Sequence, residues 1–582
     1  MIEIRTTARL VAAIVGAACV ASEAGELTTR LRQPVAMAAS LDGGSIYVAN
    51  RRSGTISVVD PKLGRVVREV EAGRGLADLA LLPDGRHLAV VDRAGDSLVI
   101  LKVDGTEVAV ESRLPVAPDP VSVVLKPDGS GVVVASTASR KLSMIGWADR
   151  DETISPEIVG TVDLPFSPRL MVWAGSKLVV ADAFGGRLAV VDPASGRVES
   201  SRSIPGHNIR GLAVSPNGRS LVLAHQVLNR LARSSFEDIH WGTLLTNDLR
   251  IVRLDTVLSV EPEVDLLKGS RLSGLGQTGR GSGDPGAIAF AGEGRLFAVV
   301  LSGVGEVAFG RDPAASLRRV AVGQMPTSLL TDPDGSIIYA ADAMDDTIGV
   351  VDVASGKLAR SISLGPRPEL GPVERGERLF FDARVSHDGW LSCHSCHTDG
   401  QSNGLLADTL GDDGFGAPKR ISSLMGVGTT GPWTWTGSMD RLEDQVRKSI
   451  ETSMRGRPPA EDQVADLVAY LRSLPSPRPI GTVADEDSIA RGRQSFQSRR
   501  CADCHAGPEF TEAGSFDVGL VDEAGHRKFN PPSLRGVGGR TSFLHDGRAA
   551  SLSEVFSRHR HPRESGWSYS EVEDLVAYLR TL

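Results

Sequence analysis

The chain has 582 residues, more than a single hydrophobic core can organise, so we expect two or three domains. Hydrophobic residues make up 41% and charged residues 23%, which excludes both a disordered chain and a polytopic membrane protein. The 64 Lys and Arg residues against 72 Asp and Glu residues give a net charge of −8, which favours neither nucleic acid nor an anionic membrane as a partner.

The first residues have the pattern of a secretory signal peptide. A basic start is followed by the apolar residues 10–21 and by small residues at the −3 and −1 positions of a cut after Ala24. The apolar run is too short to span a bilayer. We therefore expect residues 1–24 to be removed and the protein to reach the periplasm without an integral membrane segment. A retained anchor, or a lipid attached through Cys19, is the alternative.

A repeating unit of short strands fills residues 25–366. Each copy has an apolar strand, a corner of the Pro-Asp-Gly type and further strands of alternating polarity. The corners at Asp42, Asp84 and Asp128 are 42 and 44 residues apart, a period typical of propeller blades. One four-stranded blade cannot bury both of its faces, so the blades must stack around an axis. The corners predict an all-β domain of seven blades.

The propeller units also carry a recognisable motif and one irregularity. Residues 47–50 (Tyr-Val-Ala-Asn), followed by a Val-Val-Asp strand, resemble the YVTN-type propeller repeat. The fifth unit is too long, which predicts an insertion over residues 229–285, and insertions of this kind often lie on a binding face. His240 lies in this insertion, and His207 and His225 precede it. They are either polar loop residues or part of an interface with the next domain.

Four of the five cysteines fall in two copies of one motif, Cys-x-x-Cys-His, at residues 393–397 and 501–505. This motif attaches c-type haem: the two cysteines form thioether bonds, and the histidine is the proximal iron ligand. A zinc ribbon is the alternative, but its cysteine pairs are usually much closer in sequence. We predict two covalently bound c-type haems. The predicted cofactor-binding residues are Cys393, Cys396, His397, Cys501, Cys504 and His505, and His397 and His505 are the iron ligands.

The two haem motifs belong to a tandem repeat of 108 residues. Residues 466–472 (Asp-Leu-Val-Ala-Tyr-Leu-Arg) recur at 574–580, again 108 positions later. The apolar residues of this segment have helical spacing, and the segment closes each copy as the terminal helix of a cytochrome c does. We therefore expect an all-α region of two cytochrome c modules, residues 367–475 and 476–582.

Residues 369–582 resemble the di-haem family of bacterial cytochrome c peroxidases and MauG. Besides the two haem motifs, the resemblance rests on residues 531–537 (Pro-Pro-Ser-Leu-Arg-Gly-Val), residues 543–548 (Phe-Leu-His-Asp-Gly-Arg) and the repeated terminal helix. It implies a di-haem oxidoreductase that exchanges electrons with a small redox protein, a cytochrome or a cupredoxin. Peroxide is the oxidant that the resemblance implies if the protein is catalytic.

The resemblance also implies where further iron ligands lie. In the family, one ligand comes from the helix after the His-Asp-Gly turn, and in the second module this place is taken by His559. We predict His559 as the distal ligand of the haem at Cys501 and Cys504. His561 is the competing ligand, and a solvated surface histidine is the alternative for His559.

The first module has Ser449 at the matching position, and a serine is not a suitable ligand. Met454, at the end of the same predicted helix, is our preferred thioether ligand, with Met439 as the competitor. A core-filling role is the alternative for Met454. Trp433 and Trp435 either line the gap between the haems or belong to the core.

The sequence departs from its family in the first module. No histidine occurs between His397 and His505, where peroxidases place a displaceable ligand, and no acidic residue for peroxide cleavage can be placed. Catalytic residues are therefore left unassigned. Three functions are open: a peroxidase-like oxidoreductase, a non-catalytic electron relay that uses the propeller for docking, and, by fold analogy alone, a dehydrogenase site in the propeller axis.

Overall fold

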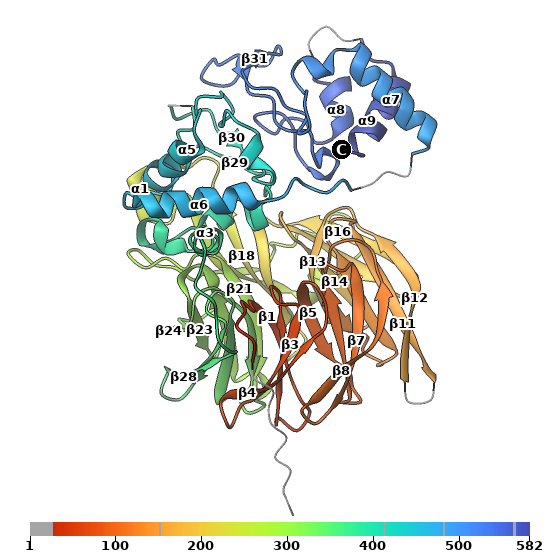
Figure 1. Ribbon diagram of the computed structural model, residues 1–582, viewed down its shortest axis with the longest axis vertical. Helices are drawn as coiled ribbons and strands as arrows, with labels where there is room; N and C mark the ends of the chain where they lie inside the picture. Colours follow the sequence, from red (N-terminus) through yellow and green to blue (C-terminus); the bar gives the residue numbers. More distant parts are fainter. Residues whose placement is uncertain (1–26, 151–152, 413, 481–483, 563–565) are drawn as a thin grey trace, which may run out of the picture.

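The computed structural model describes residues 27–150, 153–412, 414–480, 484–562 and 566–582 (Figure 1). The predicted signal peptide and Cys19 lie outside the described residues. Seven four-stranded antiparallel sheets are arranged around an axis, and a region of helices and loops follows them. The seven predicted blades are thus confirmed.

Each blade is built from four strands that are consecutive in the chain. The blades are β1–β4 (Pro34–Ala39, Ile46–Asn50, Thr55–Asp60, Arg65–Glu71), β5–β8 (Leu76–Leu81, His87–Asp92, Ser97–Asp104, Glu107–Pro115), β9–β12 (Pro120–Leu125, Gly131–Ser136, Lys141–Arg150, Thr153–Asp163), β13–β16 (Pro168–Ala174, Lys177–Asp182, Arg187–Asp192, Arg197–Ser203), β17–β20 (His207–Val214, Ser220–Leu228, Leu245–Arg253, Arg271–Gly274), β21–β24 (Pro285–Ala291, Leu296–Leu301, Glu306–Gly310, Arg318–Ala321) and β25–β28 (Pro326–Thr331, Ile337–Asp342, Thr347–Asp352, Lys357–Ser363).

The core of the propeller lies between adjacent blades. The second strand of a blade, such as β6 or β10, is buried along its whole length because neighbouring blades cover both of its faces. The fourth strand forms the outer edge, and β28 is exposed at all but one position. Charged side chains on such edges, like those of Lys357 and Arg360, discourage edge-to-edge pairing with other chains.

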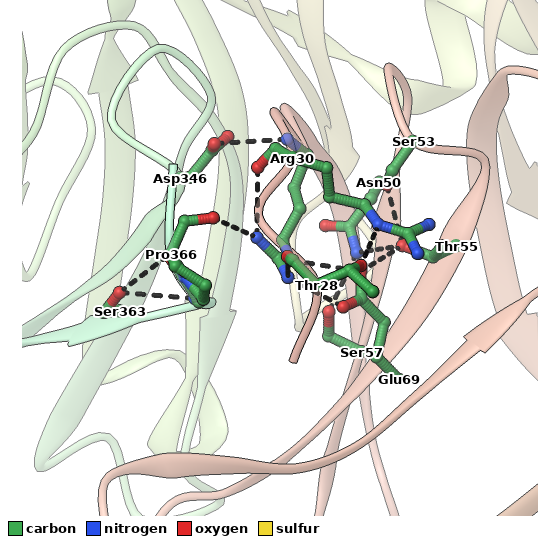
Figure 2. A network of polar contacts seen from close by, with 12 residues as sticks. Thr28, Arg30, Asn50, Ser53, Thr55, Ser57, Glu69, Asp346, Ser363 and Pro366 are labelled. Atoms are coloured by element: carbon green, nitrogen blue, oxygen red, sulfur yellow. Dashed lines mark hydrogen bonds and ion pairs between the residues drawn. The ribbon is translucent and has the colours of Figure 1, made fainter. Parts of the chain in front are cut away.

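The ring closes without exchange of a strand between the first and last blades. The side chain of Arg32 is fully buried and forms an ion pair with Glu69 of β4 at 2.8 Å. Its guanidinium also donates to the carbonyls of Thr28 and Pro366, and its backbone N–H donates to Asp346 of the last blade. Figure 2 labels the partners Thr28, Glu69, Asp346 and Pro366 in this network. Side-chain contacts around one buried arginine therefore join the two ends of the ring.

The fifth blade is enlarged at two places rather than by one insertion. The connection between β18 and β19 carries the short helix α1 (Phe236–His240), and α2 (Leu254–Leu258) follows β19. The predicted insertion over residues 229–285 therefore contains two of the blade's own strands, β19 and β20. The corner of this blade lies at Asn217, between β17 and β18, so the spacing of corners could not locate the two later strands.

The region after the propeller consists of short helices, two small ladders and long loops. Its helices are α3 (Pro372–Phe380), α4 (Cys393–Cys396), α5 (Leu442–Lys448), α6 (Glu461–Ser473), α7 (Glu486–Ser498), α8 (Leu552–Ser557) and α9 (Tyr569–Leu579). Two-stranded ladders pair β29 (Leu406–Ala407) with β30 (Lys419–Arg420), and β31 (Phe516–Asp517) with β32 (Lys528–Phe529). The expected all-α class is not confirmed, because loops and ladders form much of the wall around each candidate site.

The tandem repeat is visible in how the first and last helices of each module cross. A Cβ atom at Gly376 of α3 would lie 2.0 Å from the Asp466 carbonyl of α6, and one at Gly492 of α7 would lie 2.0 Å from the Asp574 carbonyl of α9. Only glycine permits such a close approach. The arginine before each glycine pairs with the same aspartate side chain at 2.7 Å. The same type of helix crossing thus occurs once in each module.

The first module rests on one face of the propeller, with α3 and α6 beside it (Figure 1). Arg378 of α3 pairs with Asp345 at 2.9 Å, and Glu377 pairs with Arg52 of the first blade at 2.9 Å. None of the helices in the described part of the chain combines the length and the apolar character needed to cross a bilayer.

Candidate haem-binding sites

The first Cys-x-x-Cys-His motif begins on the helix α4. Ser392 caps this helix and forms a capping box with Ser395. Cys393, Cys396 and His397 line a cavity of about 350 Å³. The Nδ1 of His397 donates to the carbonyl of Ser422 at 2.8 Å, which leaves Nε2 available as a ligand.

The second motif lines a separate cavity of about 160 Å³. Cys501 lies in a 3₁₀ turn, and Cys504 and His505 follow it. The Nδ1 of His505 donates to the carbonyl of Phe510 at 3.1 Å, so a backbone carbonyl orients this ring, as it does for His397. Each motif therefore presents two cysteines and one oriented imidazole to its own cavity.

The cysteine pairs fit neither disulfides nor a zinc ribbon. No disulfide joins these four cysteines in the described structure, and burial raises the pKa of the Cys393 and Cys396 thiols to about 12 and that of the Cys501 thiol to about 11. The two pairs line different cavities, so they cannot share one ion. Among the described residues, no group of three potential metal ligands includes a cysteine.

Two arginines in the cavity walls, Arg420 buried and Arg540 half-buried, fit a haem, whose two carboxylates need cationic partners. Arg420 and Arg540 line both cavities. Their guanidiniums donate only to backbone carbonyls, and neither has a carboxylate partner among the described residues. Burial lowers the pKa of Arg420 to about 9 and that of Arg540 to about 10, which is the cost of an uncompensated buried charge. Haem carboxylates at this wall would remove that cost.

Trp435 separates the two cavities and contacts both. Its indole N–H donates to the carbonyl of Arg420 at 2.7 Å, and the Arg420 guanidinium lies 5.2 Å from the ring centroid. Trp433 lines only the first cavity, and its indole N–H donates to the Val427 carbonyl at 3.1 Å. Of the two tryptophans named from the sequence, Trp435 therefore occupies the gap between the sites.

In the second module, His561 lines the cavity and His559 does not. The rings of His561 and His505 are 6.5 Å apart between centroids, and burial lowers the pKa of His561 to about 4. The helix α8 ends at Ser557, so the helical spacing that pointed to His559 no longer holds there. Arg560 has a left-handed φ of 50°, and this turn brings His561 to the cavity wall. The geometry therefore favours His561 over His559 as the distal ligand of the second haem.

In the first module, Met454 lines the cavity and is buried, with 4% of its surface exposed. A π-helical turn over Ser449–Ser453 extends α5 and ends at Met454. Met454 belongs to a buried hydrophobic cluster with Leu244 and Trp390, whereas Met439 pairs with Trp433 through the backbone and does not line the cavity. The cavity-lining position makes Met454 the better placed of the two thioethers.

His545, a residue without a role predicted from the sequence, lies in the wall of the second cavity. Its ring stacks on Phe529 at 4.2 Å and lies edge-on to Trp435 at 6.5 Å. Neither ring nitrogen has a hydrogen-bond partner in the described structure, and burial lowers the pKa of this imidazole. The only signal in the sequence was its place in the Phe-Leu-His-Asp-Gly-Arg segment.

The propeller holds the first haem motif through buried polar contacts. The Asp284 carboxylate accepts hydrogen bonds from the hydroxyls of Ser392 at 2.5 Å and Ser395 at 2.7 Å. His207 donates from Nε2 to the carbonyl of Ser395 at 2.9 Å, and Gln226 donates to its hydroxyl at 3.2 Å. Of the two possibilities left open for the propeller histidines, the interface role thus applies to His207.

A second set of contacts joins the propeller to the segment just after the motif. Burial tends to raise the pKa of Asp399, but the guanidiniums of Arg169 and Arg210 outweigh it and hold that pKa well below its usual range. Arg210 lies 2.9 Å from the carboxylate. The backbone N–H of Asp399 donates to His394, and burial lowers the pKa of that histidine to about 3. The propeller thus fixes both sides of α4.

Comparisons with known proteins agree with this architecture. Residues 372–477 match a family model described as di-haem cytochrome c peroxidase, residues 489–582 match cytochrome c, and residues 61–154 match a seven-bladed lactonase propeller. The methylamine utilization protein MauG of Methylorubrum extorquens is 27% identical over 325 residues, which cover 44% of this chain and 90% of that protein.

Two further relatives align with a similar share of the chain. The hydrazine synthase subunit gamma of Kuenenia stuttgartiensis is 26% identical and covers 36% of this chain and 77% of that protein. The cytochrome c551 peroxidase of Nitrosomonas europaea is 24% identical and covers 40% of this chain and 88% of that protein. The chain therefore joins a seven-bladed propeller to a carboxy-terminal region related to the di-haem cytochrome c peroxidases and MauG.

Proposed function

We propose that this chain is an exported di-haem c-type cytochrome that acts as a peroxidase-like oxidoreductase. One observation carries the proposal: each Cys-x-x-Cys-His motif has its own cavity, and the wall formed by Arg420, Trp435 and Arg540 is common to both. In this proposal Cys393 and Cys396 attach one haem and Cys501 and Cys504 the other, and the haems supply the redox chemistry when bound.

The chain's own residues would have distinct tasks. His397 and His505 are the proximal ligands, oriented through their Nδ1 hydrogen bonds. His561 is the second protein ligand within reach of the second site, whereas Met454, which lines the first, would leave that iron open for the substrate. Trp435 provides an aromatic path between the cavities.

The second module is the better placed entry point for electrons. Ala502 and Asp503, between its two cysteines, are both exposed. A small redox protein, a cytochrome or a cupredoxin, could therefore approach the attached edge of this haem. The first module would then be the reaction site, and peroxide is the oxidant we propose. Gln445 lines that cavity with its Oε1 unpartnered, so its side-chain amide can hydrogen-bond a small polar substrate.

A non-catalytic electron relay is the second candidate. Met454 lines the first cavity and His561 the second, so both irons could have two protein ligands. Iron with two strong ligands transfers electrons but leaves no position for a substrate. In that case the propeller would serve as a docking module for the redox partner.

Four measurements on the purified full chain test these proposals in sequence. Haem staining of a denaturing gel and a pyridine haemochrome assay should give two covalent haems per chain. Low-temperature EPR should then show a high-spin ferric signal from the first haem. In a separate assay, the protein should oxidise a reduced small cytochrome when peroxide is added. Two low-spin signals without peroxide turnover would favour the relay, and material with no Soret band would refute both.

Export is a separate part of the proposal. It rests on the signal-peptide pattern of residues 1–24. Amino-terminal sequencing of protein from the periplasmic fraction should begin at Gly25. Recovery of a lipid-modified chain in the membrane fraction, starting at Cys19, would support the anchored alternative instead.

A further inference from the structure

Two histidines and an aspartate from different domains meet at the edge of the propeller. His240 ends the helix α1, whereas His387 and Asp388 lie in a 3₁₀ turn (His387–Gly389) shortly before Cys393. The Nδ1 of His240 is 2.9 Å from Oδ2 of Asp388 and 3.3 Å from Nε2 of His387. The same Nε2 is 3.2 Å from the Asp388 oxygen. The three atoms form a nearly equilateral triangle.

This triangle has the dimensions of one face of a tetrahedral metal site. Bonds of ~2.0–2.1 Å from Zn²⁺ to nitrogen or oxygen, at tetrahedral angles, place ligand atoms about 3.3 Å apart. The observed separations run from 2.9 to 3.3 Å. Two imidazoles and one carboxylate are a common donor set for Zn²⁺ and other divalent transition metals, and a poor one for Ca²⁺ or Mg²⁺.

The triangle is held in place by the protein around it. Asp388 adopts a left-handed φ of 56°, and its carbonyl accepts from the Gly281 N–H at 2.7 Å. The next carbonyl, of Gly389, accepts from Gly283 at 3.0 Å. The Phe236 ring covers His387, with 4.5 Å between centroids. The glycine-rich segment of the fifth blade therefore orients the carboxylate before an ion arrives.

We propose that His240, His387 and Asp388 bind a divalent transition-metal ion, with Zn²⁺ as the ion that fits them best. The three side chains are 32%, 26% and 20% exposed, so water can reach the fourth position. The ion links the propeller to the segment that leads into the first haem motif. Its binding energy therefore adds to the docking of the first module.

In a second cluster of three potential ligands, a lysine already pairs with the carboxylates. Asp412, Asp522 and His526 also bring three potential ligands together. There, the Lys419 ammonium lies 2.7 Å from Asp412 and 2.9 Å from Asp522, so a cation already neutralises the carboxylates. No lysine or arginine is paired with Asp388 in the described structure. His526 is therefore a matched control residue.

The test uses the full-length holoprotein, washed with a chelator that leaves covalent haem in place. Calorimetric titration with ZnCl₂, and zinc measured by mass spectrometry against haem iron, should give one zinc ion per chain. His240→Ala and Asp388→Asn should each weaken zinc binding by at least about tenfold. His526→Ala should bind zinc as the wild type does. Zinc should also raise the melting temperature of the wild type but not of His240→Ala.

The proposal is overturned if the washed wild type takes up no zinc, or if His240→Ala binds it as tightly and in the same ratio. Far-UV circular dichroism and the Soret band will show whether each variant is folded. If His240→Ala fails this check, Asp388→Asn and His387→Gln provide the same comparison, since both keep the size of the side chain. These outcomes do not depend on peroxide turnover.

Discussion

The two haem modules share one repeat but differ in what surrounds their cysteines. In the first, the two residues between the cysteines, His394 and Ser395, are 4% and 0% exposed because the propeller covers them. In the second, Ala502 and Asp503 are both exposed. The helix crossing, the pair of cysteines and the oriented histidine are common to both. The repeat thus preserves the cavity, while the propeller determines which haem edge a partner can reach.

Removal of either cysteine pair is expected to have the largest effect. A chain with Cys501→Ser and Cys504→Ser should bind one haem instead of two, and so should a chain with Cys393→Ser and Cys396→Ser, since each cavity depends on its own motif. Pyridine haemochrome assays measure the ratio directly. An unchanged ratio in either double variant would contradict the idea of two independent sites.

Trp435 should matter for electron transfer between the modules, since it lines both cavities. Trp435→Ala should slow inter-haem electron transfer by about tenfold or more, equivalent to about 1.4 kcal/mol in the barrier. Trp433→Ala is the control, because Trp433 lines only the first cavity. Flash reduction followed at the two Soret bands separates the rates, and equal rates in both variants would remove Trp435 from the path.

Two substitutions test whether His561 or His559 is the second ligand of the second haem. His561→Ala should convert the second haem from low spin to high spin in EPR, because His561 lines that cavity. His559→Ala should leave the spectrum and the reduction potential unchanged. The reverse result would restore the interpretation drawn from helical spacing, and no change in either variant would show that neither histidine is a ligand.

Asp284 should contribute to the stability of the first module alone. Its carboxylate accepts from two buried hydroxyls, so Asp284→Ala should lower the free energy of unfolding by about 1–3 kcal/mol. Asp255→Ala, at an exposed position, should change it by no more than about 0.5 kcal/mol. Denaturant unfolding monitored at each haem would locate the loss, and an equal loss in the second module would argue against local docking.

A smaller and pH-dependent effect is expected from Asp399. The arginines hold its folded pKa well below the usual value of 3.8, so its contribution is complete above that value and is lost as the pH falls toward the folded pKa. The stability difference between the wild type and Asp399→Asn should thus stay constant from pH 7 to about pH 5 and shrink below about pH 4. Unfolding midpoints at several pH values measure this, and a difference that grows in acid would reverse the assigned sign.

Local sequence patterns predicted the parts of the molecule that depend on local spacing. The blade period predicted the seven blades, and the two haem motifs identified cysteines and histidines that line the two cavities. The sequence ranked His561 behind His559 because the periodicity did not indicate that the helix ends at Ser557. The sequence did not predict that Arg420 and Arg540 line the cavities, because the shared wall forms only when the two modules pack together. The His240 cluster joins residues 147 positions apart, a distance at which spacing carries no information.

The closure of the ring at Arg32 bears on the order of assembly. Every strand of the propeller lies between Pro34 and Ser363, and the last partner of Arg32 in the ring is Pro366. All the described strands of the seven blades therefore precede the first haem motif. As the chain emerges from its amino-terminal end, the propeller can finish folding while Cys393 is still to come. We expect the surface that receives the first module to form before haem is attached to that module.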